Sequence, residues 1–186
     1  MKRLLCLLVL LAALVPVTAS ASVNIKDVKF AEMYPTAQTE LKLTGAALLK
    51  WAMLFDVYAG AFYLPENTAG ENWTADVPKH LELSYFRNFK ADDFSSSSDR
   101  LLRDNLPGEQ YRRLAERLQN FYQLFEDIKP GDRYSLTYLP DIGTELRLNG
   151  ELLGVATGHD FAIAYFGLWI GPSPISANFR DQLLGK

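Results

Sequence analysis

The segment LKLTGAALLKWAMLFDVYAGAFYLP, residues 41–65, decides the predicted fold. It is rich in aromatic and other apolar residues, and Gly45 and Pro65 interrupt it. Residues 41–50 and 53–64 therefore predict two consecutive strands, with breaks at Gly45 and Pro65.

The rest of the chain predicts further strands and helices in blocks. Asn149-Gly150 is the strongest short signal for a hairpin, because a type I′ turn needs two residues that tolerate positive φ. Four consecutive serines, residues 95–98, are expected to cap a helix that begins at Asp99. The other expected strands are residues 24–30, 80–89, 132–139, 144–148 and 151–156, and the other expected helices are residues 109–126, 160–170 and a short tail helix that ends at Leu184.

The order of these blocks predicts the fold class. Strands, helices, strands and helices follow one another without alternating βαβ units. This order favours an α+β domain, in which an antiparallel β-sheet has helices layered on one face. Residues 22–186 are enough for a single domain with a real core.

Two segments carry a resemblance to a known family. They are residues 41–65, quoted above, and residues 159–185, HDFAIAYFGLWIGPSPISANFRDQLLG. In these blocks the chain resembles the chalcone isomerase-like family, and the resemblance extends from about Val28 onward. It implies an open-faced β-sandwich, a sheet backed by helices, which agrees with the α+β prediction.

The resemblance also implies where catalysis would occur. The family's catalysts close a flavanone ring by adding a phenolate oxygen to an enone, and an arginine just after the glycine turn holds the developing oxyanion. Here that region reads LTGAALLK, residues 43–50, so the arginine's place between Ala47 and Leu49 is apolar. Lys50 is a point charge that does not reproduce a planar guanidinium. We therefore expect the family's fold without its reaction, and no catalytic residue.

The N-terminus predicts export. Lys2 and Arg3 precede an apolar run, residues 4–17, and Ala19-Ser20-Ala21 form the small-x-small pattern of a signal peptidase site. The run is too short for a stable membrane anchor. Residues 1–21 are therefore expected to be a signal peptide cleaved after Ala21, which leaves a periplasmic or secreted protein without a stable anchor.

The composition limits which partners and cofactors are expected. Without Lys2 and Arg3 the chain has 17 basic and 22 acidic residues, a formal charge of −5 with histidine neutral, so nucleic acid is not an expected partner. Cys6 is the only cysteine, and the two histidines, His80 and His159, have no ligand-type residue at metal-binding spacing. We expect no metal site and no cofactor. A domain without disulfides favours the bacterial periplasm.

One strand suggests a binding site for an anion. In residues 80–89, alternation places Arg87 and Tyr85 on the apolar side, where a guanidinium is costly unless an anion meets it. The functional interpretation is an anion clamp at the mouth of an apolar pocket, similar to the arginine and tyrosine attributed to fatty-acid-binding members of the family. The structural interpretation is that Arg87 reaches solvent or an acid such as Asp92.

Other side chains could line the same pocket. By the resemblance, Tyr58 falls where a threonine assists the family's catalysts, and Lys50 is the nearest cation to the missing arginine. Small side chains around Gly60 leave space that a ligand or, more commonly, a helix fills. We expect Trp51 and Trp169 to anchor the core. A third tryptophan, Trp73, is expected in a loop beside a cavity.

The leading hypothesis is an exported, non-catalytic protein that binds a small apolar or amphipathic molecule such as a fatty acid. Its candidate ligand-binding residues are Arg87, Tyr85, Lys50 and Tyr58. The first alternative is an isomerase, an intramolecular lyase acting on a phenolic enone, in which Lys50 or Arg87 polarises the carbonyl. The second is an envelope scaffold without a ligand, which an exposed apolar patch would mark. The sequence does not indicate an oligomeric state.

Overall fold

The computed structural model describes residues 21–52 and 54–186. The predicted signal peptide lies outside these residues, except for Ala21 at its end. In the described part of the chain, no helix is both long enough and apolar enough to cross a membrane.

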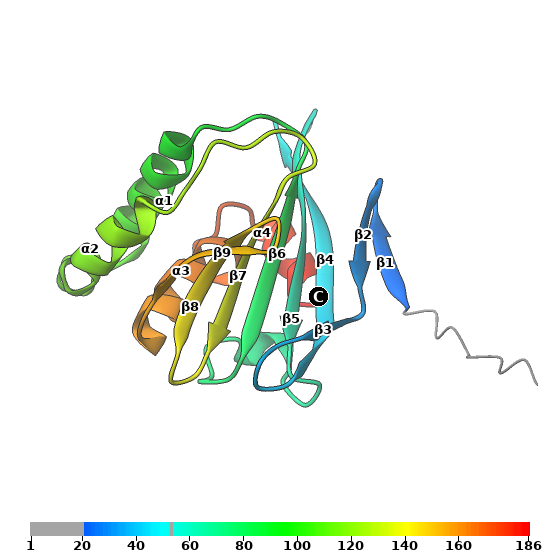
Figure 1. The fold of residues 1–186 in the computed structure, drawn as a ribbon, viewed down its shortest axis with the longest axis horizontal. Helices are drawn as coiled ribbons and strands as arrows, with labels where there is room; N and C mark the ends of the chain where they lie inside the picture. The colour runs from blue at the N-terminus through cyan, green and yellow to red at the C-terminus, as the bar shows by residue number, and fades with distance from the viewer. Residues whose placement is uncertain (1–20, 53) are drawn as a thin grey trace, which may run out of the picture.

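A seven-stranded antiparallel sheet is the centre of the fold (Figure 1). Its strands follow chain order and are β3 (Met33–Pro35), β4 (Glu40–Trp51), β5 (Phe55–Leu64), β6 (Lys79–Tyr85), β7 (Arg133–Leu139), β8 (Gly143–Leu148) and β9 (Glu151–Ala156). Each strand pairs with the next along the chain, and most connections are short. The exceptions are residues 65–78 between β5 and β6, and the segment between β6 and β7, where the chain leaves the sheet to form two helices.

Helices cover one face of the sheet, and a separate hairpin covers part of the other (Figure 1). The helices are α1 (Ala91–Asn105), α2 (Gly108–Tyr122), α3 (His159–Ile170) and α4 (Ala177–Leu183), with a short 3₁₀ turn, η1, at Gly70–Asn72. The hairpin on the far face consists of β1 (Ser22–Ile25) and β2 (Val28–Ala31). The predicted α+β fold with helices on one face is thus confirmed.

Local sequence explains several of these elements. Asn149 and Gly150 have φ values of 51° and 87°, which confirms the predicted tight turn between β8 and β9. Helix α3 is apolar on nearly every side and is largely buried between the sheet and its neighbouring helices. The carboxylate of Asp160 in its first turn receives two hydrogen bonds, of 2.6 and 2.8 Å, from Arg117 of α2.

Two glycines allow α4 to lie directly on the sheet. A Cβ atom on Gly45 would overlap the carbonyl oxygen of Gln182, and one on Gly60 would lie 2.6 Å from the ring of Phe179. Gly45 sits at a β-bulge within the continuous strand β4, so the predicted break is a bulge and not a turn. At Gly60, helix α4 fills the space left by the small side chains. Of the two occupants considered from the sequence, a ligand or a helix, the helix was the more common one.

Several local predictions were wrong. The strand expected at residues 24–30 is the β1–β2 hairpin, because the chain turns at Lys26, whose φ is 53°. Strand β6 ends at Tyr85, not at residue 89, because the chain bends at Phe86 and turns toward α1. Helix α1 begins at Ala91, so the four serines lie inside it; the hydroxyl of Ser97, for example, donates to the Asp93 carbonyl at 2.5 Å. The backbone N–H of Lys90 donates to the Asp93 carboxylate at 2.8 Å, and this contact takes the place of the predicted serine cap.

The tryptophans also differ from expectation. Trp51 is 69% exposed at the end of β4, so it does not anchor the core. Trp73 is 8% exposed and packs in the core, so it does not lie open beside a cavity. Trp169 packs against the core as expected.

Candidate ligand-binding cavity

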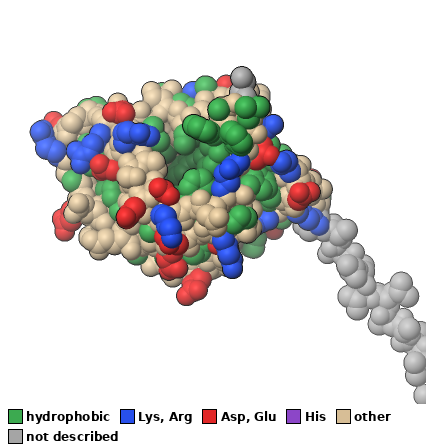
Figure 2. Space-filling view, turned by 90° about the horizontal axis from the view of Figure 1, so that it is seen from above, with side chains coloured by type: hydrophobic (Ala, Val, Ile, Leu, Met, Phe, Trp, Pro, Cys, Tyr) green, Lys and Arg blue, Asp and Glu red, His purple; other side chains and the backbone are tan. Residues whose placement is uncertain are grey.

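A large cavity lies between the helix-facing side of the sheet, α1 and the C-terminal part of α3. Its volume is about 1280 Å³ including the mouth, which exceeds the roughly 300–1,000 Å³ typical of ligand pockets. Figure 2 shows the opening as a hollow lined by hydrophobic side chains, with basic side chains near its rim. The lining residues are Leu49, Lys50, Trp51, Phe55, Val57, Tyr58, Leu81, Leu83, Tyr85, Arg87, Asn88, Phe89, Asp93, Phe94, Ser96, Ser97, Ser98, Arg100, Leu101, Phe125, Tyr134, Leu136, Leu146, Tyr165, Leu168, Trp169, Ile175 and Ser176.

The interior of the cavity is mostly apolar because of strand alternation. Leu81, Leu83 and Tyr85 are every second residue of β6 and face the helices, and Leu136 of β7 and Leu146 of β8 extend this surface. Each of these side chains is buried. An apolar guest placed here would lose contact with water along most of its length, which is the main source of affinity in such pockets.

Four tyrosines supply hydroxyl groups to the cavity wall. Tyr58 accepts a hydrogen bond of 3.0 Å from the indole Nε1 of Trp169. The hydroxyl of Tyr165 donates to Ser98 at 3.2 Å, and that of Tyr134 donates to the Glu126 carbonyl at 3.1 Å. The Tyr85 hydroxyl makes no hydrogen bond with any residue that the structure describes, although the residue is only 4% exposed. Tyr85 therefore has both donor and acceptor capacity left for a guest.

Burial keeps these hydroxyls protonated. Desolvation raises the pKa of Tyr58 and Tyr165 and raises the pKa of Tyr134 to about 12. The pKa of Tyr85 is raised well above its usual value by burial and by the neighbouring tyrosines. At neutral pH the cavity wall therefore offers neutral hydroxyl donors and no phenolate base.

Charged groups gather at the mouth. Among the described lining residues the cations are Lys50, Arg87 and Arg100, all exposed, and the one carboxylate is that of Asp93, also exposed. The mouth thus has an excess of positive charge on a chain whose net charge is −3. This arrangement matches a molecule with an apolar body and an anionic end.

Arg87 follows the end of β6 and does not continue its alternation. Its Nε donates to the Asp56 carbonyl at 3.0 Å, and its guanidinium lies 5.0 Å from the centre of the Phe55 ring. The side chain is exposed, but it borders the same cavity as Tyr85. It is held by a backbone carbonyl and an aromatic ring and not by Asp92, and it forms no ion pair with a residue that the structure describes.

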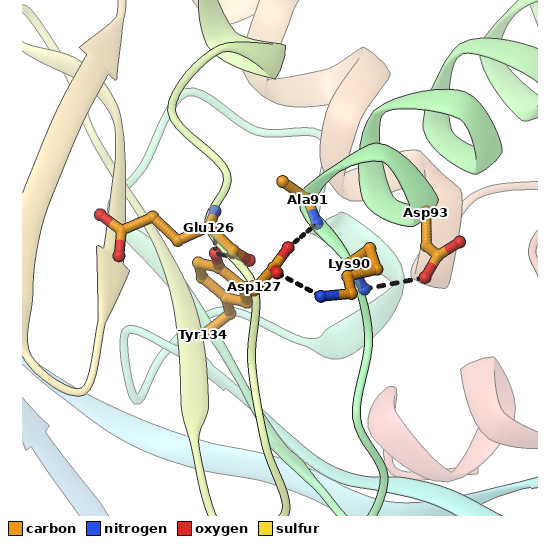
Figure 3. Close-up of polar contacts among 6 residues, drawn as sticks. All are labelled: Lys90, Ala91, Asp93, Glu126, Asp127 and Tyr134. Carbon is orange, nitrogen blue, oxygen red and sulfur yellow. Dashed lines mark hydrogen bonds and ion pairs between the residues drawn. The ribbon is translucent and has the colours of Figure 1, made fainter.

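The wall formed by α1 is fixed to the segment that follows α2 (Figure 3). Asp127 accepts hydrogen bonds from Lys90 Nζ at 2.6 Å and from the Ala91 backbone N–H at 3.0 Å. Phe89 and Ile128 form an isolated antiparallel bridge beside these contacts. The two loops that carry the α1–α2 pair, drawn side by side at the top of Figure 1, are therefore joined at the rim of the cavity.

The four predicted ligand-binding residues, Lys50, Tyr58, Tyr85 and Arg87, border this one cavity. Sequence reasoning missed the contribution of α1, namely Arg100 and the serines, and the contact between Trp169 and Tyr58. The spacing of Tyr165 and Trp169, four residues apart on one helix face, was the available signal. It was obscured because α3 is apolar all round.

The place of the family's arginine is apolar in three dimensions as well. Ala47 and Leu49 are buried in the core on the helix side of the sheet, and Lys50 lies at the mouth, 3.9 Å from the Asp56 carboxylate. Among the described residues, no three histidine, cysteine, aspartate or glutamate side chains are grouped so that they could hold a metal ion.

Comparisons with known proteins agree with this architecture. The sequence comparison with curated proteins found no match. Among solved structures, the fold is similar to that of the fatty-acid binding protein AtFAP1 of Arabidopsis thaliana, with a TM-score of 0.67 and 18% identity over 89% of this chain and 96% of that one. The model of the family described as chalcone isomerase-like matches residues 22–185. This match spans nearly all of the described residues, and the chain therefore belongs to the chalcone isomerase-like family.

Proposed function

We propose that this protein is an exported, non-catalytic carrier of a small apolar or amphipathic molecule, such as a fatty acid. The observation that carries the proposal is the cavity itself, an apolar interior with three exposed cations at its mouth. The similar solved structure is that of a fatty-acid binding protein, which supports the same class of ligand. The proposed export rests on the N-terminal sequence, residues 1–21.

The ligand would enter with its apolar end first. Each methylene group that leaves water contributes about 0.8 kcal/mol, so a long acyl chain supplies most of the binding free energy. The anionic end would stay near Lys50, Arg87 and Arg100, where water can still reach it. The free hydroxyl of Tyr85 borders the same cavity as Arg87, where it would donate to the head group of the guest.

The isomerase alternative has weaker support. Its reaction needs a cation beside the substrate carbonyl inside the site, whereas the cations that border the cavity are exposed at the mouth. Tyr58 and Tyr85 have raised pKa values, which makes them poor proton donors or bases at neutral pH. Turnover of a chalcone well above the solution rate, lost in Lys50→Ala or Arg87→Ala, would establish this alternative.

The carrier proposal is tested by displacement of a fluorescent fatty acid from delipidated protein. We expect palmitate to displace the probe, and mass spectrometry to find a bound acid or lipid in protein that has not been delipidated. Arg87→Ala and Tyr85→Phe should each weaken palmitate binding about tenfold, because each removes a polar partner of the head group. Arg113→Ala is the matched control, since Arg113 is an exposed cation on α2 that pairs with Glu109 and does not border the cavity. Absence of probe binding, or equal binding by all variants, would refute the proposal.

A further inference from the structure

An exposed apolar tip closes the β4–β5 hairpin. Leu54 is 80% exposed, Trp51 is 69% exposed and Phe55 is 45% exposed, and these values include the two highest among the large hydrophobic side chains that the structure describes. The rings of Trp51 and Phe55 are stacked, with centroids 6.2 Å apart. The cyan ribbon of this hairpin reaches the upper end of the molecule in Figure 1. Exposed apolar side chains that gather at one end of a molecule mark a surface that binds a protein, a membrane or a ligand.

Basic side chains surround this tip. Lys26, Lys50 and Arg87 all lie close to Asp56: Lys26 pairs with its carboxylate, Lys50 lies 3.9 Å from it, and Arg87 donates to its carbonyl. One carboxylate therefore stands among three cations. Lys26 and Lys50 keep about half of their side chains exposed, 47% and 50%. Apolar side chains at the end of a projection, with exposed cations behind them, are the pattern of a segment that enters the interface of an anionic bilayer.

The tip also forms one side of the cavity mouth. Lys50, Trp51 and Phe55 line the cavity, as does Arg87 beneath Phe55. Ile175, 45% exposed, belongs to the same lining. Whatever surface receives the tip is therefore in contact with the entrance to the cavity.

We propose that the β4–β5 tip docks on a bilayer that contains anionic lipids. Trp51 and Leu54 enter the interfacial layer, and Lys26, Lys50 and Arg87 lie among the lipid phosphates. The proposal that the tip docks depends only on the tip. Docking would also let the guest pass between the cavity and the bilayer without crossing bulk water, and this consequence rests on the proposed carrier function.

The size and charge of the tip favour a bilayer over a second copy of the chain. A stable protein interface buries about 800 Å² on each partner, and three side chains on a narrow hairpin are too few for this. Each Lys or Arg near an anionic bilayer contributes about 1 kcal/mol. Because the chain as a whole is negative, an anionic surface repels most of the molecule and attracts this end, which orients the mouth toward the lipid.

Vesicle co-sedimentation of the chain without its predicted signal peptide tests the proposal. Mixed phosphatidylcholine–phosphatidylglycerol vesicles should bind the protein, and pure phosphatidylcholine vesicles should bind it at least tenfold more weakly. Leu54→Ser should weaken binding to the mixed vesicles about tenfold. Leu152→Ser, at a 45% exposed position of β9 away from the cavity, is the matched control and should bind as the unchanged protein does.

Tryptophan fluorescence gives a second readout. Trp51 is the exposed one of the three tryptophans, so its transfer into lipid should shift the emission to shorter wavelength. Trp51→Phe should keep vesicle binding and lose the shift. No binding to mixed vesicles, equal binding by Leu54→Ser, or unchanged emission in the bound state would overturn the proposal. So would a dimer of the unchanged protein that Leu54→Ser converts to a monomer, because a second copy would then cover the tip.

Failure of docking and failure of the carrier function are distinguishable. Leu54 does not line the cavity, so palmitate should displace the fluorescent fatty acid from the Leu54→Ser variant in solution with unchanged affinity. Tyr85→Phe should bind vesicles normally and palmitate weakly. Probe binding without vesicle binding would refute docking alone, and vesicle binding without probe binding would refute the carrier function alone.

Discussion

Tyr58 and Tyr85 lie opposite each other on β5 and β6, but only the Tyr58 hydroxyl has a hydrogen-bond partner among the described residues. Tyr58→Phe leaves the Nε1 donor of Trp169 without its partner, so we expect a loss of about 1 kcal/mol in the free energy of unfolding. Tyr85→Phe removes a hydroxyl without a protein partner, so the same quantity should change by less than about 0.5 kcal/mol. Urea denaturation of the two variants measures the difference. Equal losses would contradict the assignment of the Tyr85 hydroxyl to the guest.

His80 is a second residue with a measurable consequence. It is 1% exposed, its ring lies 3.6 Å from that of Tyr34, and its Nδ1 forms a hydrogen bond of 2.8 Å with Thr137. Its Nε2 is buried and has no hydrogen-bond partner among the described residues. Burial, reinforced by the positive charge of Arg147, lowers its pKa from 6.5 to about 3. The unfolded chain therefore binds a proton below about pH 6.5 that the folded chain does not bind, and stability falls as the pH decreases from 6.5 toward 3.

The expected slope for this one proton is about 1.4 kcal/mol for each pH unit once the pH is well below 6.5. Unfolding free energies measured between about pH 6 and pH 5 avoid most of the carboxylate titration. The His80→Gln variant should show a shallower dependence than the unchanged protein, whatever its absolute stability. The same slope in both proteins would show that His80 titrates freely in the folded state.

At the scale of elements, the contact of α4 with β4 and β5 depends on two glycines, which have no side chain to keep the helix away from the sheet. Gly60→Val should destabilise the fold by about 1–3 kcal/mol, since its added atoms meet the ring of Phe179. Gly45→Ala should cost at least as much, because its Cβ meets a backbone oxygen of α4, which moves less readily than a side chain. Gly108→Ala is the control: nothing lies near its Cβ, and alanine favours the first turn of α2, so stability should be unchanged or slightly higher. Thermal unfolding of the three variants tests this order.

At the scale of the whole molecule, a cavity of this size links ligand binding to stability. A fatty acid at one hundred times its dissociation constant should raise the free energy of unfolding by about 2.7 kcal/mol. Each added methylene group should tighten binding about fourfold until the cavity is filled, from about 0.8 kcal/mol per group. Titration with saturated acids of increasing length, followed by thermal unfolding, measures both effects.

Leu136→Trp is the informative variant for this experiment, because its ring would occupy part of the cavity. It should fold, as its unfolding without ligand can verify, and it should accept only the shorter acids. An unfolding free energy that does not depend on any acid, in a protein that is folded, would contradict the link between the cavity and binding.

The sequence alone determined the elements whose cause is local. The positive-φ turn at Asn149-Gly150 and the all-apolar helix α3 follow from neighbouring residues. The antiparallel sheet with helices on one face then followed from the order of the blocks and the family resemblance.

Only the tertiary structure decided the rest. The end of β6 at Tyr85 depends on where α1 must start, and the exposure of Trp51 depends on how far β4 and β5 extend beyond their neighbours. The cavity and its cationic mouth join residues from the sheet, α1 and α3 that are far apart in the sequence. Backbone preferences act over a few residues, whereas burial and enclosed volume depend on which distant surfaces meet, and the apolar pattern of one segment does not specify that partner.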